Sequence, residues 1–261
     1  MAIHDRFDLV IFDWAGTMVD FGCQAPVRAL REAFARQGVA ITDVQARRDM
    51  GKTKVEHVRA LLRDPDIENA WIEAHGRGSA DSDIAELMKD LVPLMRDQAE
   101  RAALLIDGAR AAVETLRGEG IKVGSSTGYT REMMAPVLRE AAAQGYVPDH
   151  LVCSGETPAG RPAPLMIYKA CAELGVWPLS RVVKVDDTEA GVAEGCAAGC
   201  FTVGIAASGN GVGLSQDALS KLPAADRAGR LALAEKSLRE AGADVVIDTV
   251  AGLIQVLRSA P

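Results

Sequence analysis

The chain has 261 residues and a formal net charge of −7, and 48% of its residues are hydrophobic, which is enough apolar material for a substantial core. The acidic balance, without a stripe of Lys or Arg, disfavours nucleic acid and anionic membrane surfaces as main partners. No apolar segment approaches the roughly 20 residues that span a bilayer, and the amino terminus lacks the apolar stretch of a signal peptide. We therefore expect a cytoplasmic globular protein of one domain with a large insertion.

Short apolar runs rich in Val and Ile recur along the chain and predict buried strands. They lie at 9–13, 121–125, 150–153, 182–186, 201–205 and 244–248. Segments of helical periodicity lie between several of these runs, at 109–120, 130–145 and 163–175. The alternation predicts an α/β fold, a Rossmann-like parallel sheet with helices on both faces. Ligands of such sheets bind beyond the carboxyl ends of the strands.

Residues 14–120 separate the first two predicted strands, which is far more than a crossover helix requires. Within this stretch, residues 22–103 show helical spacing, for example at Val27, Leu30 and Phe34, and no convincing strand. We therefore predict an all-helical cap domain at 22–103, placed over the active edge of the sheet. The remaining residues, 1–21 and 104–261, are predicted to form the α/β core domain.

Polar groups lie at or after the carboxyl ends of four of the predicted strands. They are Asp13, Ser125 to Thr127 with Gly128, Arg161, and the pair Asp186 and Asp187. Taken singly, each group has an ordinary interpretation as a helix cap, a surface ion pair or a turn. Taken together, two aspartates from different strands can hold Mg²⁺, while a hydroxyl, backbone amides and a guanidinium surround an anion. The set is typical of phosphoryl transfer to a carboxylate nucleophile.

These motifs resemble those of the haloacid dehalogenase superfamily, which fall in the same order on FDWAGT, SSTGY, GRP and KVDDT over the whole chain. The atypical Ala15 and a lysine within MGKTKVEHVRALL make the sequence more narrowly similar to the phosphonoacetaldehyde hydrolase, or phosphonatase, family. That family cleaves a carbon–phosphorus bond to give acetaldehyde and phosphate. The resemblance implies a Mg²⁺-dependent enzyme with a small phosphonate substrate and a homodimer formed largely through the cap.

The resemblance also implies a role for each motif. Asp13 attacks phosphorus while a lysine forms an imine with the substrate aldehyde, and the imine takes up the electrons of the broken bond. The leaving group is then carbon, so position 15 needs no acid to protonate an alkoxide, and Ala15 contributes only its backbone carbonyl. The implied metal ligands are Asp13, the carbonyl of Ala15, and Asp187. The phosphonate is held by Thr127, Gly128 and Arg161.

Two lysines, Lys52 and Lys54, are candidates for the imine. On a helix, Lys54 and His57 share a face because they lie three residues apart, whereas Lys52 and His57 lie five apart and do not. A neighbouring imidazole can tune an amine or carry a proton, and the resemblance also aligns the family's lysine with Lys54. We therefore predict catalytic roles for Lys54 and His57. Burial, the metal, Arg161 and His57 are candidate causes of the lowered lysine pKa that imine formation requires.

Three further residues, Met50, Cys23 and Tyr129, align near the family's substrate site, although each also suits an ordinary packing role. The family often carries a second acid four residues after the metal aspartate, where this chain has Gly191. We expect Asp186 to replace that acid as an indirect metal ligand through water.

Two alternatives to a phosphonatase stay open. A general phosphatase of the same superfamily is disfavoured by Ala15, because its usual general acid is missing. A non-catalytic relative that kept the fold is disfavoured because Asp13, Arg161, Asp187 and Lys54 are retained together.

Overall fold

A computed structural model describes residues 2–260 of the chain. Six parallel strands form one sheet in the order β3-β2-β1-β4-β5-β6. They are β1 (Leu9–Phe12), β2 (Lys122–Thr127), β3 (His150–Cys153), β4 (Val182–Asp186), β5 (Phe201–Ile205) and β6 (Val245–Ile247). The predicted α/β fold with a parallel sheet is confirmed, and three strands have the predicted bounds.

The second strand extends further than its apolar pattern indicated. β2 ends at Thr127 because the polar residues Ser125–Thr127 pair in register with Leu151–Cys153 of β3. These three residues are buried, so the strand carries its polar groups into the interior at its carboxyl end. A run of small polar residues lacks the apolar signature of a strand, which is why the predicted strand stopped at 125.

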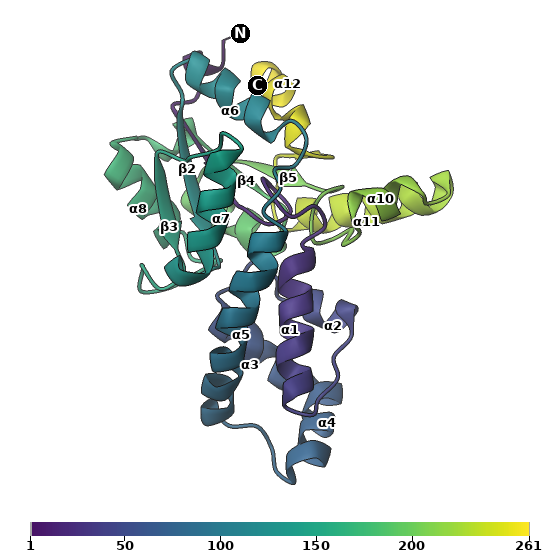
Figure 1. Cartoon of the computed structure of the whole chain (residues 1–261). Coiled ribbons are helices and arrows are strands. Elements are labelled where there is room, and N and C mark those ends of the chain that lie inside the picture. Colours follow the sequence, from purple (N-terminus) through teal and green to yellow (C-terminus); the bar gives the residue numbers. More distant parts are fainter. Residues whose placement is uncertain (1, 261) are drawn as a thin grey trace.

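Helices cover both faces of the sheet (Figure 1). One face carries α8 (Leu165–Leu174), α9 (Glu189–Ala198) and α11 (Ala224–Glu240). The other carries α6 (Ala109–Gly118), α7 (Arg131–Ala143) and α12 (Leu253–Ser259). Shorter elements are η1 (Ile3–Asp5), η2 (Leu179–Arg181), η3 (Val250–Gly252) and α10 (Gln216–Ser220). The long helix α11 escaped prediction because only Ala234 and Leu238 of its residues are buried, which leaves little apolar periodicity.

Residues 22–103, called the helical insertion below, contain five helices and no strand. They are α1 (Gln24–Arg36), α2 (Asp43–Arg47), α3 (Lys54–Leu62), α4 (Pro65–His75) and α5 (Asp81–Arg101). Figure 1 shows α1 and α5 side by side, projecting from the sheet, and α5 also packs against α7. The helical character agrees with the prediction. The division into two domains stays a prediction, since one apolar cluster joins Phe12 and Trp14 to Leu30 and Leu91.

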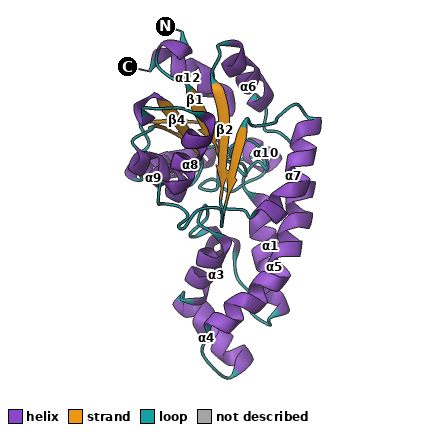
Figure 2. Cartoon of the chain, turned by 90° about the vertical axis from the view of Figure 1, so that its left-hand side faces the viewer, coloured by secondary structure: helices purple, strands orange, loops and turns teal. Residues whose placement is uncertain are grey.

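The carboxyl ends of the central strands point toward the helical insertion, where α3 lies nearest to them (Figure 2). Polar groups that follow β1, β2 and β4 are thereby directed at the segment that carries Lys54. Within residues 2–260, no helix is both long enough and apolar enough to cross a membrane.

Candidate active site

A cavity between the sheet and the helical insertion gathers most of the predicted site residues. The predicted site residues on its wall are Asp13, Ala15, Cys23, Met50, Lys54, Thr127, Gly128, Tyr129 and Arg161. Parallel strands explain this convergence, since Asp13 follows β1 and Thr127 ends β2 at the same sheet edge. The structure therefore brings residues from both parts of the chain into one place, with Asp187 beside Asp13 and His57 in the next turn of α3 after Lys54.

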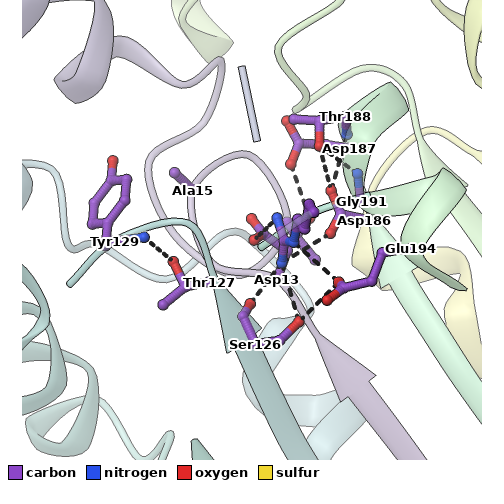
Figure 3. A network of polar contacts seen from close by, with 12 residues as sticks. Asp13, Ala15, Ser126, Thr127, Tyr129, Asp186, Asp187, Thr188, Gly191 and Glu194 are labelled. Atoms are coloured by element: carbon purple, nitrogen blue, oxygen red, sulfur yellow. Dashed lines mark hydrogen bonds and ion pairs between the residues drawn. The ribbon is translucent and has the colours of Figure 1, made fainter. Parts of the chain in front are cut away.

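Three carboxylates lie close together, and one of them, that of Asp13, lines the cavity (Figure 3). One oxygen from each of Asp13, Asp186 and Asp187 lies within 4.8 Å of the others, and all three residues are buried. Burial and the nearby charge of Asp186 raise the pKa of Asp13 to about 6. Burial and the charge of Asp13 raise the pKa of Asp187 well above its ordinary value. Such a set of oxygen donors needs a cation to stay ionised, which fits a hard divalent metal.

Donors on three sides hold the carboxylate of Asp187. The hydroxyl of Thr17 donates to it at 3.2 Å, and the backbone N–H of Asn210 at 2.8 Å. The Cys23 sulfur lies 3.1 Å from the same carboxylate and 3.2 Å from the carbonyl oxygen of Ala15. Burial raises the pKa of Cys23 well above its ordinary value, so its thiol stays protonated and donates. Cys23 thus lies between two of the predicted metal ligands.

Arg161 is buried and oriented by several acceptors. Its Nη1 lies 2.8 Å from Oδ1 of Asp13, and its Nη2 donates to the carbonyl of Ser126 at 2.8 Å. Its Nε donates to Glu194 at 3.0 Å. A guanidinium fixed on so many sides presents its charge beside the nucleophile in a constant orientation.

Lys184 and Glu194 complete this network, and the sequence analysis missed both. The amine of Lys184 is wholly buried and lies 2.8 Å from the hydroxyl of Ser126, 3.0 Å from Asp186 and 3.3 Å from Glu194. Figure 3 shows Glu194 and Ser126 reaching in from α9 and β2. The one signal in the sequence was a lysine flanked by valines in a strand buried on both faces, because such a cation needs a partner.

The charges of this buried cluster do not balance. Its acids are Asp13, Asp186, Asp187 and Glu194, and its cations are Arg161 and Lys184. When all the acids are ionised, two negative charges remain, which one divalent cation would neutralise. The donor set therefore fits the metal that the motifs imply.

The two candidate lysines occupy different surroundings. Thr53 caps α3, so Lys54 is the first helical residue, and its amine lies 3.7 Å from the sulfur of Met50 and 5.4 Å from the ring centre of Tyr129. Lys54 is 3% exposed, and burial lowers its pKa to about 8. Lys52 precedes the helix, and its amine pairs with Asp49 instead. Lys54 therefore has the environment that a neutral, nucleophilic amine needs.

His57 is neutral in this environment. The ring is fully buried, and burial together with the charge of Lys54 lowers its pKa to about 3. An uncharged imidazole cannot supply the positive charge that was considered as one cause of the lowered lysine pKa. Burial and the charge of Arg161 act in that direction instead. A catalytic role for His57 stays a prediction and is restricted to the neutral ring.

The side chain of Asp186 occupies the space beside Gly191 where a Cβ atom would lie. A Cβ atom at position 191 would overlap the carboxylate of Asp186, which accepts hydrogen bonds from the N–H of Thr188 at 3.1 Å and its hydroxyl at 2.8 Å. The acid at 186 therefore fills the space in which a side chain at 191 would begin. The location of this carboxylate is compatible with the expectation that Asp186 replaces the acid that the family often has at position 191. The replacement stays a prediction.

The helical insertion rests closely on the loops beside the cavity. A Cβ atom on Gly128 would lie 2.7 Å from the carbonyl oxygen of Lys52, and one on Gly160 would overlap the side chain of Thr53. Only glycine permits such an approach at these two positions. The segment that carries Lys54 is thereby held against the loop that follows Thr127 and the loop that carries Arg161.

Comparisons with known proteins agree with this geometry. A family model described as haloacid dehalogenase-like hydrolase matches residues 7–199. The chain is 46% identical over 241 residues to phosphonoacetaldehyde hydrolase of Syntrophobacter fumaroxidans, covering 92% of this chain and 87% of that protein. It is 44% identical over 248 residues to phosphonoacetaldehyde hydrolase of Paraburkholderia phytofirmans, covering 95% and 93%. A crystal structure of a phosphonoacetaldehyde hydrolase-like protein from Oleispira antarctica has a TM-score of 0.95 and 40% identity, covering 97% and 92%. This chain belongs to the phosphonoacetaldehyde hydrolase family of the haloacid dehalogenase-like hydrolases.

Proposed function

We propose that this chain hydrolyses the carbon–phosphorus bond of phosphonoacetaldehyde to acetaldehyde and phosphate. Relatives at 44% and 46% identity bear the name of that activity. The observation that carries the proposal is one cavity that holds a buried carboxylate, Asp13, and a buried amine, Lys54, with a methyl group at position 15. A cytoplasmic location and a homodimer formed through the helical insertion belong to the same proposal, on the strength of the family resemblance.

The first half of the proposed reaction takes place at the aldehyde. The hydroxyl of Thr127, the backbone of Gly128 and the guanidinium of Arg161 hold the phosphonate oxygens. The neutral amine of Lys54 adds to the aldehyde carbon, and loss of water gives an iminium. The iminium lowers the barrier to bond cleavage because it accepts the electron pair that carbon would otherwise carry.

The second half takes place at phosphorus. An oxygen of Asp13 attacks phosphorus, the carbon–phosphorus bond breaks, and its electron pair moves into the iminium to form an enamine on Lys54. Water then hydrolyses the aspartyl phosphate to phosphate and Asp13. Protonation of the enamine at carbon and hydrolysis of the resulting imine release acetaldehyde and the free lysine. A divalent cation held by Asp13, the Ala15 carbonyl and Asp187, with Mg²⁺ proposed, would neutralise charge between the carboxylate and the phosphonate.

The test of this function is release of phosphate and acetaldehyde from phosphonoacetaldehyde by the purified chain. We expect equal amounts of both products, loss of activity with EDTA, and recovery when Mg²⁺ is added. Hydrolysis of phosphate monoesters with no cleavage of phosphonoacetaldehyde would instead identify a general phosphatase. Absence of turnover on either substrate class with Mg²⁺ present would favour a non-catalytic relative.

Ala15→Asp should not accelerate carbon–phosphorus cleavage. No alkoxide leaves in the proposed reaction, so an added acid has no proton to deliver, and a new carboxylate would lie beside Asp13 and the phosphonate. We expect kcat/KM for phosphonoacetaldehyde to fall by about tenfold or more, the effect of one unfavourable charge contact in a buried site. Ala15→Asn, which adds similar volume without the charge, separates repulsion from crowding. A faster variant would show that a missing acid limits the reaction.

A further inference from the structure

The loop that follows β5 touches both the nucleophile loop and the candidate metal carboxylate. The hydroxyl of Ser208 donates to the carbonyl of Gly16 at 2.7 Å. Two residues later, the N–H of Asn210 donates to Asp187 at 2.8 Å. Ser208, Asn210 and Asp187 are all buried, so these bonds are shielded from water and hold the carboxylate in one orientation.

Arg47, the last residue of α2 in the helical insertion, forms hydrogen bonds with the same loop. Its Nη1 donates to the side-chain oxygen of Asn210 at 3.2 Å, while the side-chain amide of Asn210 donates back to the Arg47 carbonyl at 3.1 Å. Its Nη2 donates to the carbonyl of Gly213 at 2.8 Å, and its Nη1 also reaches the carbonyl of Gly22 at 2.9 Å. The approach is close, since a Cβ atom on Gly213 would lie 2.6 Å from Nε of Arg47.

Asn210 is therefore shared by two parts of the chain. Its backbone fixes Asp187, and its side chain is paired on both polar atoms with Arg47 of the helical insertion. We propose that Arg47 is a positioning residue that couples the seating of the helical insertion to the orientation of Asp187 through Asn210. This inference rests on the proposed role of Asp187 as a metal ligand.

The guanidinium is suited to this coupling because its N–H donors lie in one plane and can bond several carbonyl and amide oxygens at once. A single water molecule has only two donors and cannot replace it. Without it, the side-chain oxygen of Asn210 loses its donor, although its side-chain amide can still donate to the main-chain carbonyl of residue 47. The helical insertion also loses the guanidinium contacts that tie it to the loop after β5. Removing a group that orients a metal ligand from behind typically costs about 10- to 100-fold in metal affinity or activity. On the cavity wall, Arg47 reaches the main-chain carbonyl of Cys23, at 3.5 Å, and its hydrogen bonds reach no side chain there. The loss should therefore appear in the metal affinity and in the rate of imine formation on Lys54.

The experiment compares Arg47→Ala with Arg48→Ala. Arg48 is the matched control because it is the next residue, carries the same charge and pairs with Asp64 within the helical insertion. Affinity for Mn²⁺ alone is measured by isothermal titration calorimetry, and trapping of acetaldehyde on Lys54 by borohydride is followed by mass spectrometry. We expect Arg47→Ala to weaken Mn²⁺ binding and to slow trapping, each by about 10-fold or more, and Arg48→Ala to change neither appreciably.

A double-mutant cycle tests whether Arg47 acts on Asp187 through Asn210. If Arg47 acts through Asn210, then Asn210→Ala should weaken Mn²⁺ binding in the wild-type background and have little further effect in Arg47→Ala. Additive losses, or an Arg47→Ala chain that binds Mn²⁺ and traps acetaldehyde like wild type, would overturn the coupling. Failure of the wild-type chain to bind Mn²⁺ would count against the metal site itself. In that case the trapping rates decide, and equal rates for wild type and Arg47→Ala reject the inference.

Discussion

We expect Asp13→Asn to remove hydrolysis of phosphonoacetaldehyde and to leave the fold intact. The amide has nearly the shape of the carboxylate, and its oxygen can still accept the 2.8 Å contact from Arg161, but it cannot attack phosphorus as an anion. It is also a weak ligand for a hard cation. Loss of a nucleophile typically lowers kcat by about 1,000-fold or more, and phosphate release measures that loss directly. Circular dichroism should superpose on wild type.

Asp83→Asn is the matched control for this change. Asp83 is also buried, but it lies at the start of α5, where it pairs with Arg77 and accepts the N–H of Ala80, and it does not line the cavity. We expect this variant to be less stable to heat and to keep its kcat. Near-normal turnover by Asp13→Asn would contradict the proposal that the reaction passes through a phosphate ester on Asp13.

We expect Lys54→Arg to abolish both turnover and covalent labelling, and Lys52→Arg to change neither appreciably. A guanidinium keeps the charge but is not a neutral amine and forms no imine with an aldehyde under these conditions. Incubation with acetaldehyde and borohydride should inactivate the wild-type chain, and peptide mass spectrometry should place an ethyl group on Lys54. Lys52 should stay unlabelled because its amine pairs with Asp49. An adduct on Lys52, or an active enzyme that gives no adduct, would contradict the proposed electron acceptor.

The pH dependence of labelling tests the surroundings of the amine. The neutral form of Lys54 becomes more abundant as pH rises through its pKa, which burial lowers to about 8. Labelling should therefore accelerate by about tenfold per pH unit below about pH 7 and level off above about pH 9. A lysine with an ordinary pKa would continue to accelerate beyond about pH 10. Borohydride itself consumes acid, so the rate of imine formation is best measured in short pulses at each pH.

The fold was predictable wherever apolar runs determine it. β4 and β5 are short runs rich in β-branched residues, and every residue except Phe201 is buried, so their bounds followed from the sequence. The predicted β2 lacked its last two residues, Ser126 and Thr127, because they are polar yet buried and pair with β3. The bounds of α11 could not be predicted from periodicity, because most of that helix faces solvent and its pattern is not amphipathic.

The site was predictable to the extent that strand ends position it. Asp13 directly follows β1, Asp187 directly follows β4, and Thr127 is the last residue of β2. Because β2 and β4 both pair in parallel with β1, the three residues lie at the same edge of the sheet. The choice of Lys54 rested partly on a helix-face comparison that included Lys52, yet the helix begins only at Lys54. The ion pair of Lys52 with Asp49 is what separates the two amines. Glu194 and Arg47 were missed because their partners include Arg161, Asn210 and Gly213 from distant segments, which no spacing along the chain reveals. Lys184 was missed although Asp186, one of its partners, lies two residues away in the same strand.

The shared volume of Asp186 and Gly191 also limits the order in which this site can change during evolution. Because a Cβ atom at 191 would overlap the carboxylate of Asp186, a side chain cannot be gained at 191 while that acid is present. A lineage that moves its acid from 186 to 191 must first shorten the residue at 186, passing through an ancestor that carries the acid at neither position. We therefore expect the effects of substitutions at 186 and 191 to depend on each other. Exchanging the residue at only one of these two positions between relatives would accordingly be a poor test of what that residue contributes to activity.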